Sequence, residues 1–462
     1  MAGNNLVPFI EFLPASLTNS PLRKRLTFDD EIVLQEDGNL AIPNRPGLGV
    51  KINMDALREF EETAQKAIER GAGQGLGQAA LAVPIANQAI LDGFRTAATD
   101  LKISDDDKNA KEIIPALIVG CGVIAKYHVK AMRTSGKFRC VGVVDPNKVA
   151  ADEIADEVLK DNPMLVRPKI FSSIDEALEA TPDDLQFKVA FILVPNVGNL
   201  HAELSMKVAA SNHHVFLEKP IALNLEDAQN ICKAAMMTNL SVKITVAENT
   251  AFWKPILVIS KALQEGLIGE VHGIKAKCWE SAGGPWAKCY TNDWICKGKE
   301  GPLFDSASHW IRPLRLWFGD ICSVSAISSR PIGRITGPTS MQAMLRFSSG
   351  QSAIFESVLA PNAISDQPFF VLQGTKGEIV LEGFHGEVYS YTGEPTDFKT
   401  YGDKTLLCKN HWDNSYADEN VALAEMLQSD FDPKGLRPEE ALADLKVIIA
   451  LFKSRKGSWI DV

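Results

Sequence analysis

The pattern of hydrophobic and polar positions along the 462-residue chain changes character at Ile113. From there, continuous apolar runs alternate with stretches in which apolar residues recur at helical spacing. An apolar run without polar alternation is typical of a strand that is buried on both faces of a parallel sheet. The expected strands are 113–119, 140–144, 189–194, 215–217 and 242–246, and the expected helices are 125–134, 202–210 and 225–237. This alternation predicts a doubly wound parallel sheet of the α/β class.

A second pattern begins after Pro255, where strand candidates follow one another with turn signals between several of them. They are 271–279, 321–328, 341–347, 352–359, 369–373 and 378–381, and a final helix is expected at 438–454. Strands in series without intervening helices favour antiparallel pairing. We therefore expect an α+β domain with a large, mostly antiparallel sheet.

Residues 1–112 show neither the strand–helix alternation nor the series of strands, so we expect an irregular or helical extension there. The glycine-rich run 71–77 follows a helical pattern rather than a strand, so we expect no nucleotide there. The charged run 104–108 has no apolar residue and is typical of a linker. Three segments are thus expected: an extension at 1–112, a first domain at 113–250 and a second domain at 251–462.

Composition narrows the classes of partner. The chain is 45% hydrophobic, as expected for a globular protein, and its formal net charge of -10 disfavours nucleic acid and anionic membranes. No apolar run approaches the roughly 20 residues that a membrane-spanning helix needs, and the amino terminus lacks the features of a signal peptide. The eight cysteines include no Cys-x-x-Cys pair. We therefore expect a cytoplasmic protein with reduced thiols and no metal site.

The most specific local signal is the passage from the strand at 113–119 into Gly120-x-Gly122-x-x-Ala125 and a helix. The first glycine permits a tight turn, and the second lets the backbone approach a pyrophosphate. The small Ala125 keeps helix and strand close, and the amino end of the helix faces the phosphates. This arrangement predicts a dinucleotide-binding domain.

Asp145 ends the second strand, where an acidic residue binds the adenosine ribose of a dinucleotide. Its carboxylate favours NAD because it would repel a 2′-phosphate, while the nearby Lys148 leaves NADP open. The alternative is that Asp145 only initiates a turn before Pro146.

Two further segments carry candidate catalytic groups. Lys219 follows the buried strand 215–217 and should lie at the carboxyl edge of the sheet, where ligands of doubly wound folds bind. Asp305 and His309 are four residues apart, so on a helix they share a face and the carboxylate can orient the imidazole. A surface or capping pair has the same spacing, so the pair alone leaves both roles open.

Together these motifs resemble the Gfo/Idh/MocA oxidoreductase family over residues 113–462. The matching segments are Val119-Gly120-Cys121-Gly122, Val194-Pro195-Asn196 with His201, Glu218-Lys219-Pro220, Gly301 to His309 and Gly374 to Ile379. The resemblance implies a Rossmann domain and a reversible hydride transfer between NAD, or NADP, and another carbon. That carbon would be a carbinol or carbonyl carbon of a sugar, polyol or related alicyclic alcohol.

The resemblance also implies roles for single residues. Lys219 would hydrogen-bond the reacting oxygen, and Lys219–Pro220 would be a cis peptide. His309 would act as general base or acid, and Asp305 would bind substrate or orient His309. The implied cofactor contacts are Gly120, Gly122, Ile124, Ala125, Asp145, Pro195, Asn196 and Glu218, and the expected substrate contacts are Asn249, Trp294 and Arg312.

The sequence departs from the family pattern at two positions that concern the site. Arg312 stands where many family members have an aspartate, three residues after the catalytic histidine, which leaves an anionic substrate open. The alternative for Arg312 is an ion pair with a neighbouring acid. Two extra residues separate Asn196 from His201, so the role of His201 is also open.

The amino-terminal stretch 9–50 resembles the carboxyl-terminal tail of a mandelate racemase-like enzyme of the enolase superfamily. An eight-stranded barrel cannot close from its last strand alone, and the earlier strands carry the metal ligands of that family. We therefore expect neither dehydratase nor racemase activity.

Two functions fit the sequence: an oxidoreductase, or a catalytically silent nucleotide-binding sensor or regulatory protein of the same fold. Retention of Lys219, Asp305 and His309 favours the enzyme, because a sensor needs no proton-transfer groups. The expected partner is a small molecule rather than nucleic acid or membrane, and family analogy suggests a homo-oligomer.

Overall fold

The computed structural model describes residues 33–34, 40–41 and 113–462, apart from 161–165, 182, 184, 238–241, 282–295, 297, 299–300, 361–367, 395–401, 430 and 455. The chain divides into two compact units, residues 1–84 and 85–462. In the first unit the described residues form one antiparallel pair, β1 (Val33–Leu34) with β2 (Leu40–Ala41). The rest of the enolase-like stretch, the glycine-rich run 71–77, the linker at 104–108 and Trp294 lie outside the described residues.

The first sheet is parallel and has six strands in the order β5-β4-β3-β6-β7-β8. The strands are β3 (Ile114–Val119), β4 (Phe138–Val144), β5 (Lys169–Phe171), β6 (Val189–Ile192), β7 (His214–Leu217) and β8 (Ile244–Val246). The helices between them are α4 (Val123–Ser135), α5 (Lys148–Leu159), α6 (Ile174–Glu179), α7 (Leu200–Ala210) and α8 (Leu225–Met237). The predicted Rossmann sheet is confirmed, and β5 is an additional short edge strand.

Burial on both faces explains the unbroken apolar runs. Leu117 and Val119 of β3 belong to one apolar core, whereas Ala116 and Ile118 belong to another. The first core includes residues of α7 and α8, and the second includes residues of α4 and α5. The helices therefore cover opposite faces of the sheet, as in a doubly wound fold.

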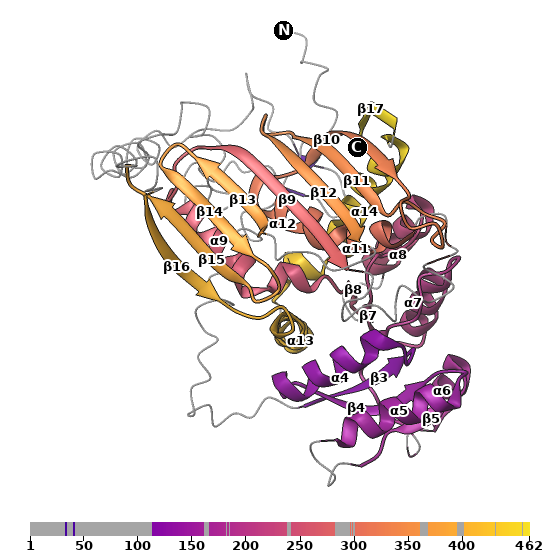
Figure 1. Cartoon of the computed structure of the whole chain (residues 1–462). Coiled ribbons are helices and arrows are strands. Elements are labelled where there is room, and N and C mark those ends of the chain that lie inside the picture. Colours follow the sequence, from indigo (N-terminus) through magenta and orange to yellow (C-terminus); the bar gives the residue numbers. More distant parts are fainter. Residues whose placement is uncertain are drawn as a thin grey trace, which may run out of the picture. The chain divides into compact units, whose positions relative to one another are not determined.

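The second sheet has nine strands in the order β16-β15-β14-β13-β9-β12-β11-β10-β17, and the whole sheet is visible in Figure 1. The strands are β9 (Val271–Ser281), β10 (Ile321–Ser329), β11 (Ser340–Phe347), β12 (Ser352–Ala360), β13 (Pro368–Gly374), β14 (Gly377–Glu382), β15 (Glu387–Thr392), β16 (Asp403–Lys409) and β17 (Lys456–Asp461). Among the described strands of this sheet, only β9 and β12 pair in parallel. The prediction of a large, mostly antiparallel sheet is thus confirmed.

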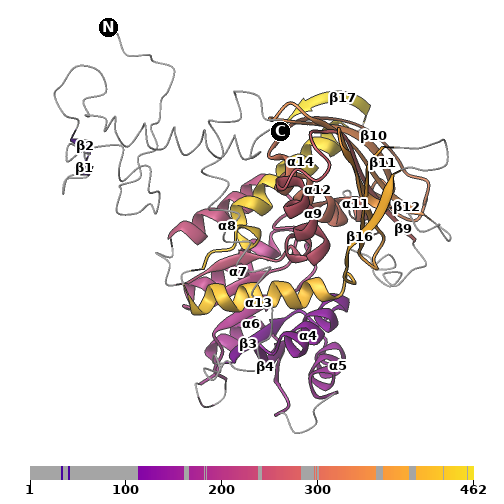
Figure 2. The ribbon, with the colours of Figure 1, turned by 90° about the vertical axis from the view of Figure 1, so that its left-hand side faces the viewer.

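One face of this sheet packs against helices, which Figure 2 shows with the sheet seen on edge. They are α9 (Lys254–Gln264), α11 (Gly301–Ser306), α12 (Ser308–Phe318) and α14 (Pro438–Ser454). Residues of β11 alternate between buried and exposed, as a sheet with one covered face requires. Helix α9 and strands β15, β16 and β17 were not predicted. The expectation that 438–454 is the last element was wrong, because β17 follows it.

Helix α13 (Asn414–Gln428) returns from the second sheet to the Rossmann domain. It packs against α4 and against the short 3-10 helix η3 (Asn249–Phe252), and it lies between the two sheets in Figure 2. Leu423 and Ala424 join the apolar core that contains Val129 of α4. No described helix is both long and apolar enough to cross a membrane.

Candidate active site

The glycine loop joins β3 to α4, and its two glycines meet different surroundings. Gly120 has a φ of +97°, and a Cβ there would lie 2.8 Å from the carbonyl carbon of Leu193. A Cβ on Gly122 would have no atom within 4 Å. Gly122 is also the N-cap of α4, which has neither a side-chain cap nor an acidic residue in its first turn. An open backbone at an uncapped helix start is suited to the pyrophosphate of a dinucleotide.

The neighbouring residues of the expected cofactor site have the following positions. Asp145 follows β4 directly, and its carboxylate accepts hydrogen bonds from the N–H of Cys121 (2.8 Å) and the N–H of Asn147 (2.8 Å). The turn role and the position beside the glycine loop are therefore combined in one residue. Lys148 points to Asp152 on its own helix, with Nζ to Oδ2 at 2.6 Å. Within the motif, Ala125 is fully buried and Ile124 partly buried.

A hydrogen bond joins the loop after β6 to the loop after β7. Lys219–Pro220 is a cis peptide, as the resemblance implied. Asn196, which follows Pro195, donates its amide to the Pro220 carbonyl at 3.0 Å, and Nδ1 of His201 lies 3.1 Å from the same oxygen. Burial lowers the pKa of His201 against weaker opposing contributions, so its imidazole is an uncharged part of this support. The role left open for His201 is thus structural in the described contacts.

Glu218 fixes the same segment through two hydrogen bonds. Its Oε1 lies 2.9 Å from Nε2 of His128 on α4, and its Oε2 accepts the N–H of Lys219 at 2.9 Å. Burial would raise the pKa of Glu218, but His128, Lys219 and His309 together hold that pKa below its usual value. The carboxylate therefore stays ionised beside the lysine.

Lys219 and Asp305 form an ion pair at this edge of the parallel sheet. Nζ of Lys219 lies 3.0 Å from Oδ2 of Asp305 and 3.2 Å from the Asp305 carbonyl oxygen. Burial disfavours the ammonium, but Asp305, followed by Glu218, outweighs it and raises the pKa of Lys219 above its ordinary value. The side chains retain 16% and 28% exposure, so the cation remains accessible to a ligand.

His309 is held by Glu248, with Nδ1 and Oε1 2.6 Å apart. The same oxygen accepts the hydroxyl of Thr250 at 2.6 Å. Burial would raise the pKa of Glu248, but His309 is the largest of the contributions that lower it to about 2. An ionised acceptor at Nδ1 leaves Nε2 as the ring nitrogen available to a substrate.

This arrangement corrects the expected link between Asp305 and His309. The predicted helix is interrupted at Ala307, so Asp305 lies near the end of α11 and His309 is the second residue of α12. Asp305 pairs with Lys219, and the carboxylate that orients the imidazole is Glu248. Glu248 was not predicted as a site residue, although it comes two residues after β8, and Asp145 and Glu218 come directly after β4 and β7. That position at the carboxyl edge was the available signal.

The expected substrate contacts Arg312 and Asn249 are engaged within the protein. Arg312 is 1% exposed, donates from Nε to Asp444 at 2.6 Å and donates to the Gly435 carbonyl at 2.8 Å. The ion pair considered as its alternative is therefore the one observed. Asn249 is buried and donates to Oγ of Ser415 at 2.6 Å. Trp294 cannot be placed because it lies outside the described residues.

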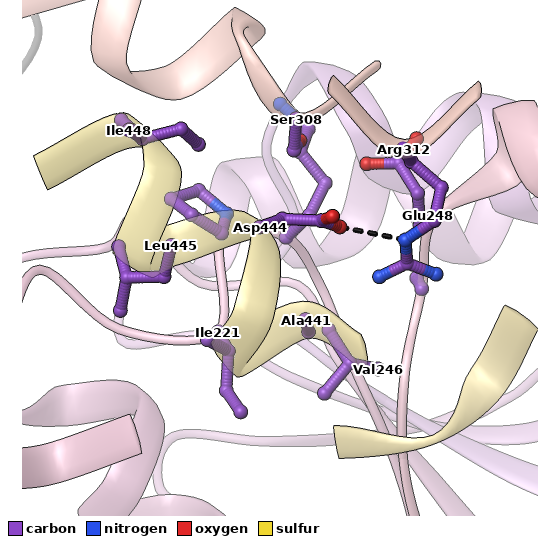
Figure 3. Close-up of a pocket in the computed structure, with 12 residues that line it drawn as sticks. Ile221, Val246, Glu248, Ser308, Arg312, Ala441, Asp444, Leu445 and Ile448 are labelled. Carbon is purple, nitrogen blue, oxygen red and sulfur yellow. Dashed lines mark hydrogen bonds and ion pairs between the residues drawn. The ribbon is translucent and has the colours of Figure 1, made fainter. Parts of the chain in front are cut away.

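Figure 3 shows the Arg312–Asp444 pair in the lining of a small pocket that adjoins the candidate site. The pocket has a volume of about 10 Å³ and includes Lys219, Glu248 and Ser308 among its lining residues. That volume is enough for about one water molecule. Among the residues that the structure describes, no group of three or more His, Cys, Asp or Glu side chains could hold a metal ion.

Comparison with known proteins supports the assignment of both domains. Residues 114–246 match the model described as "Oxidoreductase family, NAD-binding Rossmann fold", and residues 256–380 match the "GFO/IDH/MocA C-terminal domain". An inositol 2-dehydrogenase of Rhizobium meliloti is 25% identical over 270 residues, which cover 57% of this chain and 74% of that protein. The chain spans 40%, 56% and 60% of three further curated relatives.

Solved structures show the same fold. An oxidoreductase from Agrobacterium radiobacter in complex with NAD+, L-tartaric acid and magnesium is 17% identical, with a TM-score of 0.63. The WlbA dehydrogenase from Bordetella pertussis in complex with NADH and UDP-GlcNAcA is 20% identical, with a TM-score of 0.60. The matches cover 76% of this chain and 98% and 99% of those chains. Together with the two family matches, they identify the chain as carrying both domains of the GFO/IDH/MocA oxidoreductase family, with NAD as the cofactor of the first.

Proposed function

We propose that this protein is an NAD-dependent dehydrogenase or reductase that acts on a CH–OH group of a sugar, polyol or related alicyclic alcohol. The observation that carries the proposal is the pairing of His309 Nδ1 with Glu248, which leaves Nε2 without a partner among the described residues, while Glu248 lines the same pocket as Lys219. A proton-transfer group and a cation on the carboxyl side of a nicotinamide-binding sheet suit alcohol oxidation. The names of relatives, such as inositol 2-dehydrogenase and levoglucosan dehydrogenase, agree with this substrate class.

In the proposed reaction, Nε2 of His309 takes the hydroxyl proton during oxidation and returns it during reduction. Glu248 stabilises the imidazolium formed in this step, because its carboxylate is ionised and hydrogen-bonded to Nδ1. Its second contact, from Thr250, keeps the carboxylate from rotating away. NAD, when bound, supplies the hydride acceptor or donor.

Lys219 is proposed to donate a hydrogen bond to the reacting oxygen. A raised pKa keeps its ammonium charged, so it can stabilise negative charge that develops on that oxygen. Asp305 holds the ammonium in place and can accept a hydrogen bond from a second substrate hydroxyl. Both residues then act on the substrate rather than on His309.

The proposed division of labour follows the two domains. Residues 113–250 bind the cofactor, and residues 251–462 supply most of the substrate site. The proposed cofactor contacts are Gly120, Gly122, Ile124, Ala125, Asp145, Pro195, Asn196 and Glu218. Asp145 favours NAD over NADP, because its carboxylate would repel a 2′-phosphate and Lys148 is directed toward Asp152.

We also propose that the chain forms a homo-oligomer through the uncovered face of the nine-stranded sheet. Trp459 on β17 and Met344 on β11 both pair with Ser325 of β10, and Met344 pairs with Ile354 of β12. These three side chains form one row across four strands and are 43%, 52% and 46% exposed. Exposed apolar residues gathered on one face of a sheet, here with Ser325 between Trp459 and Met344, are typical of a protein interface.

The test uses the purified full-length protein. NADH and NADPH binding are followed by fluorescence titration, and a panel of sugars and polyols is assayed by NADH absorbance for wild type, Lys219→Ala and His309→Ala. We expect NADH to bind all three forms and only wild type to turn over, with losses of at least about 100-fold from the variants. Turnover by His309→Ala at the wild-type rate would remove the base assignment. Cofactor binding without turnover of any panel member would favour the sensor.

A further inference from the structure

Glu419 on α13 is fully buried, yet neither carboxylate oxygen has a side-chain hydrogen-bond partner among the described residues, and the backbone N–H of Glu248 is the donor that faces them. A buried ionised carboxylate without a partner is strongly unfavourable, whereas a protonated one carries a donor of its own. This residue therefore requires an explanation beyond packing.

The charged groups that act on Glu419 come from three different parts of the chain. Glu218 at the end of β7 and Glu248 after β8 are anions, Arg312 on α12 is a cation, and the N–H of Glu248 faces the carboxyl group. Tyr416, on the same helix as Glu419, interacts electrostatically with it. Burial, followed by the two carboxylates, outweighs the cation and raises the pKa of Glu419 well above its usual value. This direction favours the neutral carboxylic acid form of Glu419.

A matching acceptor lies in the same buried region. Oε1 of Glu248 is occupied by His309 and Thr250, but its Oε2 is buried and has no partner in the described part of the chain. Both polar atoms of Asn420 and Nδ1 of His128 are also buried and unpartnered. Such a concentration of unsatisfied donors and acceptors on packed elements is typical of sites that hold internal water.

We propose that Glu419 is a positioning residue whose protonated carboxyl donates a hydrogen bond to Oε2 of Glu248, directly or through one internal water. The chain of contacts then runs from Glu419 through Glu248 to Nδ1 of His309. The neutral carboxyl group of Glu419 thereby fixes the second oxygen of Glu248 and adds no charge near His309. This inference rests on the proposed function for its catalytic meaning, while the hydrogen-bonded chain itself can be tested without turnover.

The first test compares Glu419→Met, which has a similar shape but no donor, with Glu419→Gln, whose amide can donate. Infrared spectroscopy at pH 7 should show the C=O stretch of a protonated carboxylic acid in wild type and in Glu248→Gln, and should lose it in both Glu419 variants. In protein with 15N-labelled histidine, the Nδ1–H signal of His309 should shift in Glu419→Met and return toward the wild-type position in Glu419→Gln. Glu425→Met, a change on the same helix, is the matched control for packing.

Kinetics give the second readout. We expect Glu419→Met to lower kcat about tenfold with little change in KM or NADH affinity, the effect of losing one hydrogen bond to a charged group, and Glu419→Gln to recover most of it. An absent protonated-acid band, or a His309 signal that ignores Glu419→Met in a folded variant, would overturn the inference. If the spectra respond as expected while no substrate turns over, the hydrogen-bonded chain stands and the proposed function fails.

Discussion

At the scale of single residues, Gly120 and Gly122 fill one loop for different reasons, and each reason makes a separate prediction. Gly120→Ala should destabilise the protein by about 1–3 kcal/mol, since the position has positive φ and its Cβ would meet the backbone of Leu193. Gly122→Ala should leave stability nearly unchanged, because its Cβ enters open space, but should weaken NADH binding. Urea unfolding and NADH titration of both variants check this. Equal NADH affinity in Gly122→Ala and wild type would place the cofactor elsewhere.

Glu248 makes a prediction about pH. Its pKa is lowered from 4.5 to about 2, so its contribution to stability is fully present above pH 4.5 and is lost as the pH falls through 2. The contribution is on the order of 3 kcal/mol, and Glu248→Gln should lack this pH dependence. Urea unfolding of both proteins at pH 6 and pH 3 measures the difference. Parallel losses of stability in the two proteins would show that Glu248 is not the responsible group.

The candidate site was only partly predictable at this scale, and the reason is the distance along the chain between partners. Lys219 and His309 follow from local motifs, because a strand end and a helix place them. The carboxylate for His309 was sought four residues away, whereas Glu248 comes from 61 residues earlier. The spacing of residues on one helix does not reveal such a partner, because a parallel sheet brings the ends of strands that are distant in sequence together at one edge.

At the scale of elements, α12 and α14 are joined by buried charges. Asp444 accepts hydrogen bonds from Arg312 at 2.6 Å and Arg315 at 2.7 Å. Asp444→Asn should therefore destabilise the protein by about 3–5 kcal/mol, because it leaves the buried Arg312 without its ion-pair partner, whereas Arg315 keeps Glu440 and Asp320. Replacing Arg312 by Met and Asp444 by Leu together should cost less than the sum of the single changes.

The control for this prediction is the exposed pair of Arg437 and Asp432, with Nη2 and Oδ2 2.7 Å apart. Asp432→Asn should change the free energy of unfolding by no more than about 1 kcal/mol, because solvent screens that pair. Urea unfolding of all variants gives the comparison. Similar effects of Asp444→Asn and Asp432→Asn would contradict a structural role for the buried ion pairs of Asp444 with Arg312 and Arg315.

Elements differ in how much of their structure the sequence reveals. Helix α8 was predicted with its observed bounds, since its apolar residues recur regularly. Helix α13 was missed because Ser415, Glu419 and Asn420 occupy buried positions where an amphipathic pattern requires apolar residues. Strand β17 was missed because it lies at the edge of the sheet with most of its residues exposed. The residues that hid α13 are those that bring polar groups to the candidate site.

At the scale of the whole molecule, the row of Trp459, Met344 and Ile354 leads to the last prediction. Met344→Lys with Ile354→Glu should lower the molecular mass measured by light scattering after gel filtration, because the proposed interface would have to bury two charges. Both side chains point away from the core, so the thermal unfolding of the separated subunits should remain cooperative. Leu406→Lys is the matched control, since Leu406 is 51% exposed on β16 near the opposite edge of the sheet. A wild-type protein that is monomeric at micromolar concentration, or a double variant with the wild-type mass, would exclude this face as the interface.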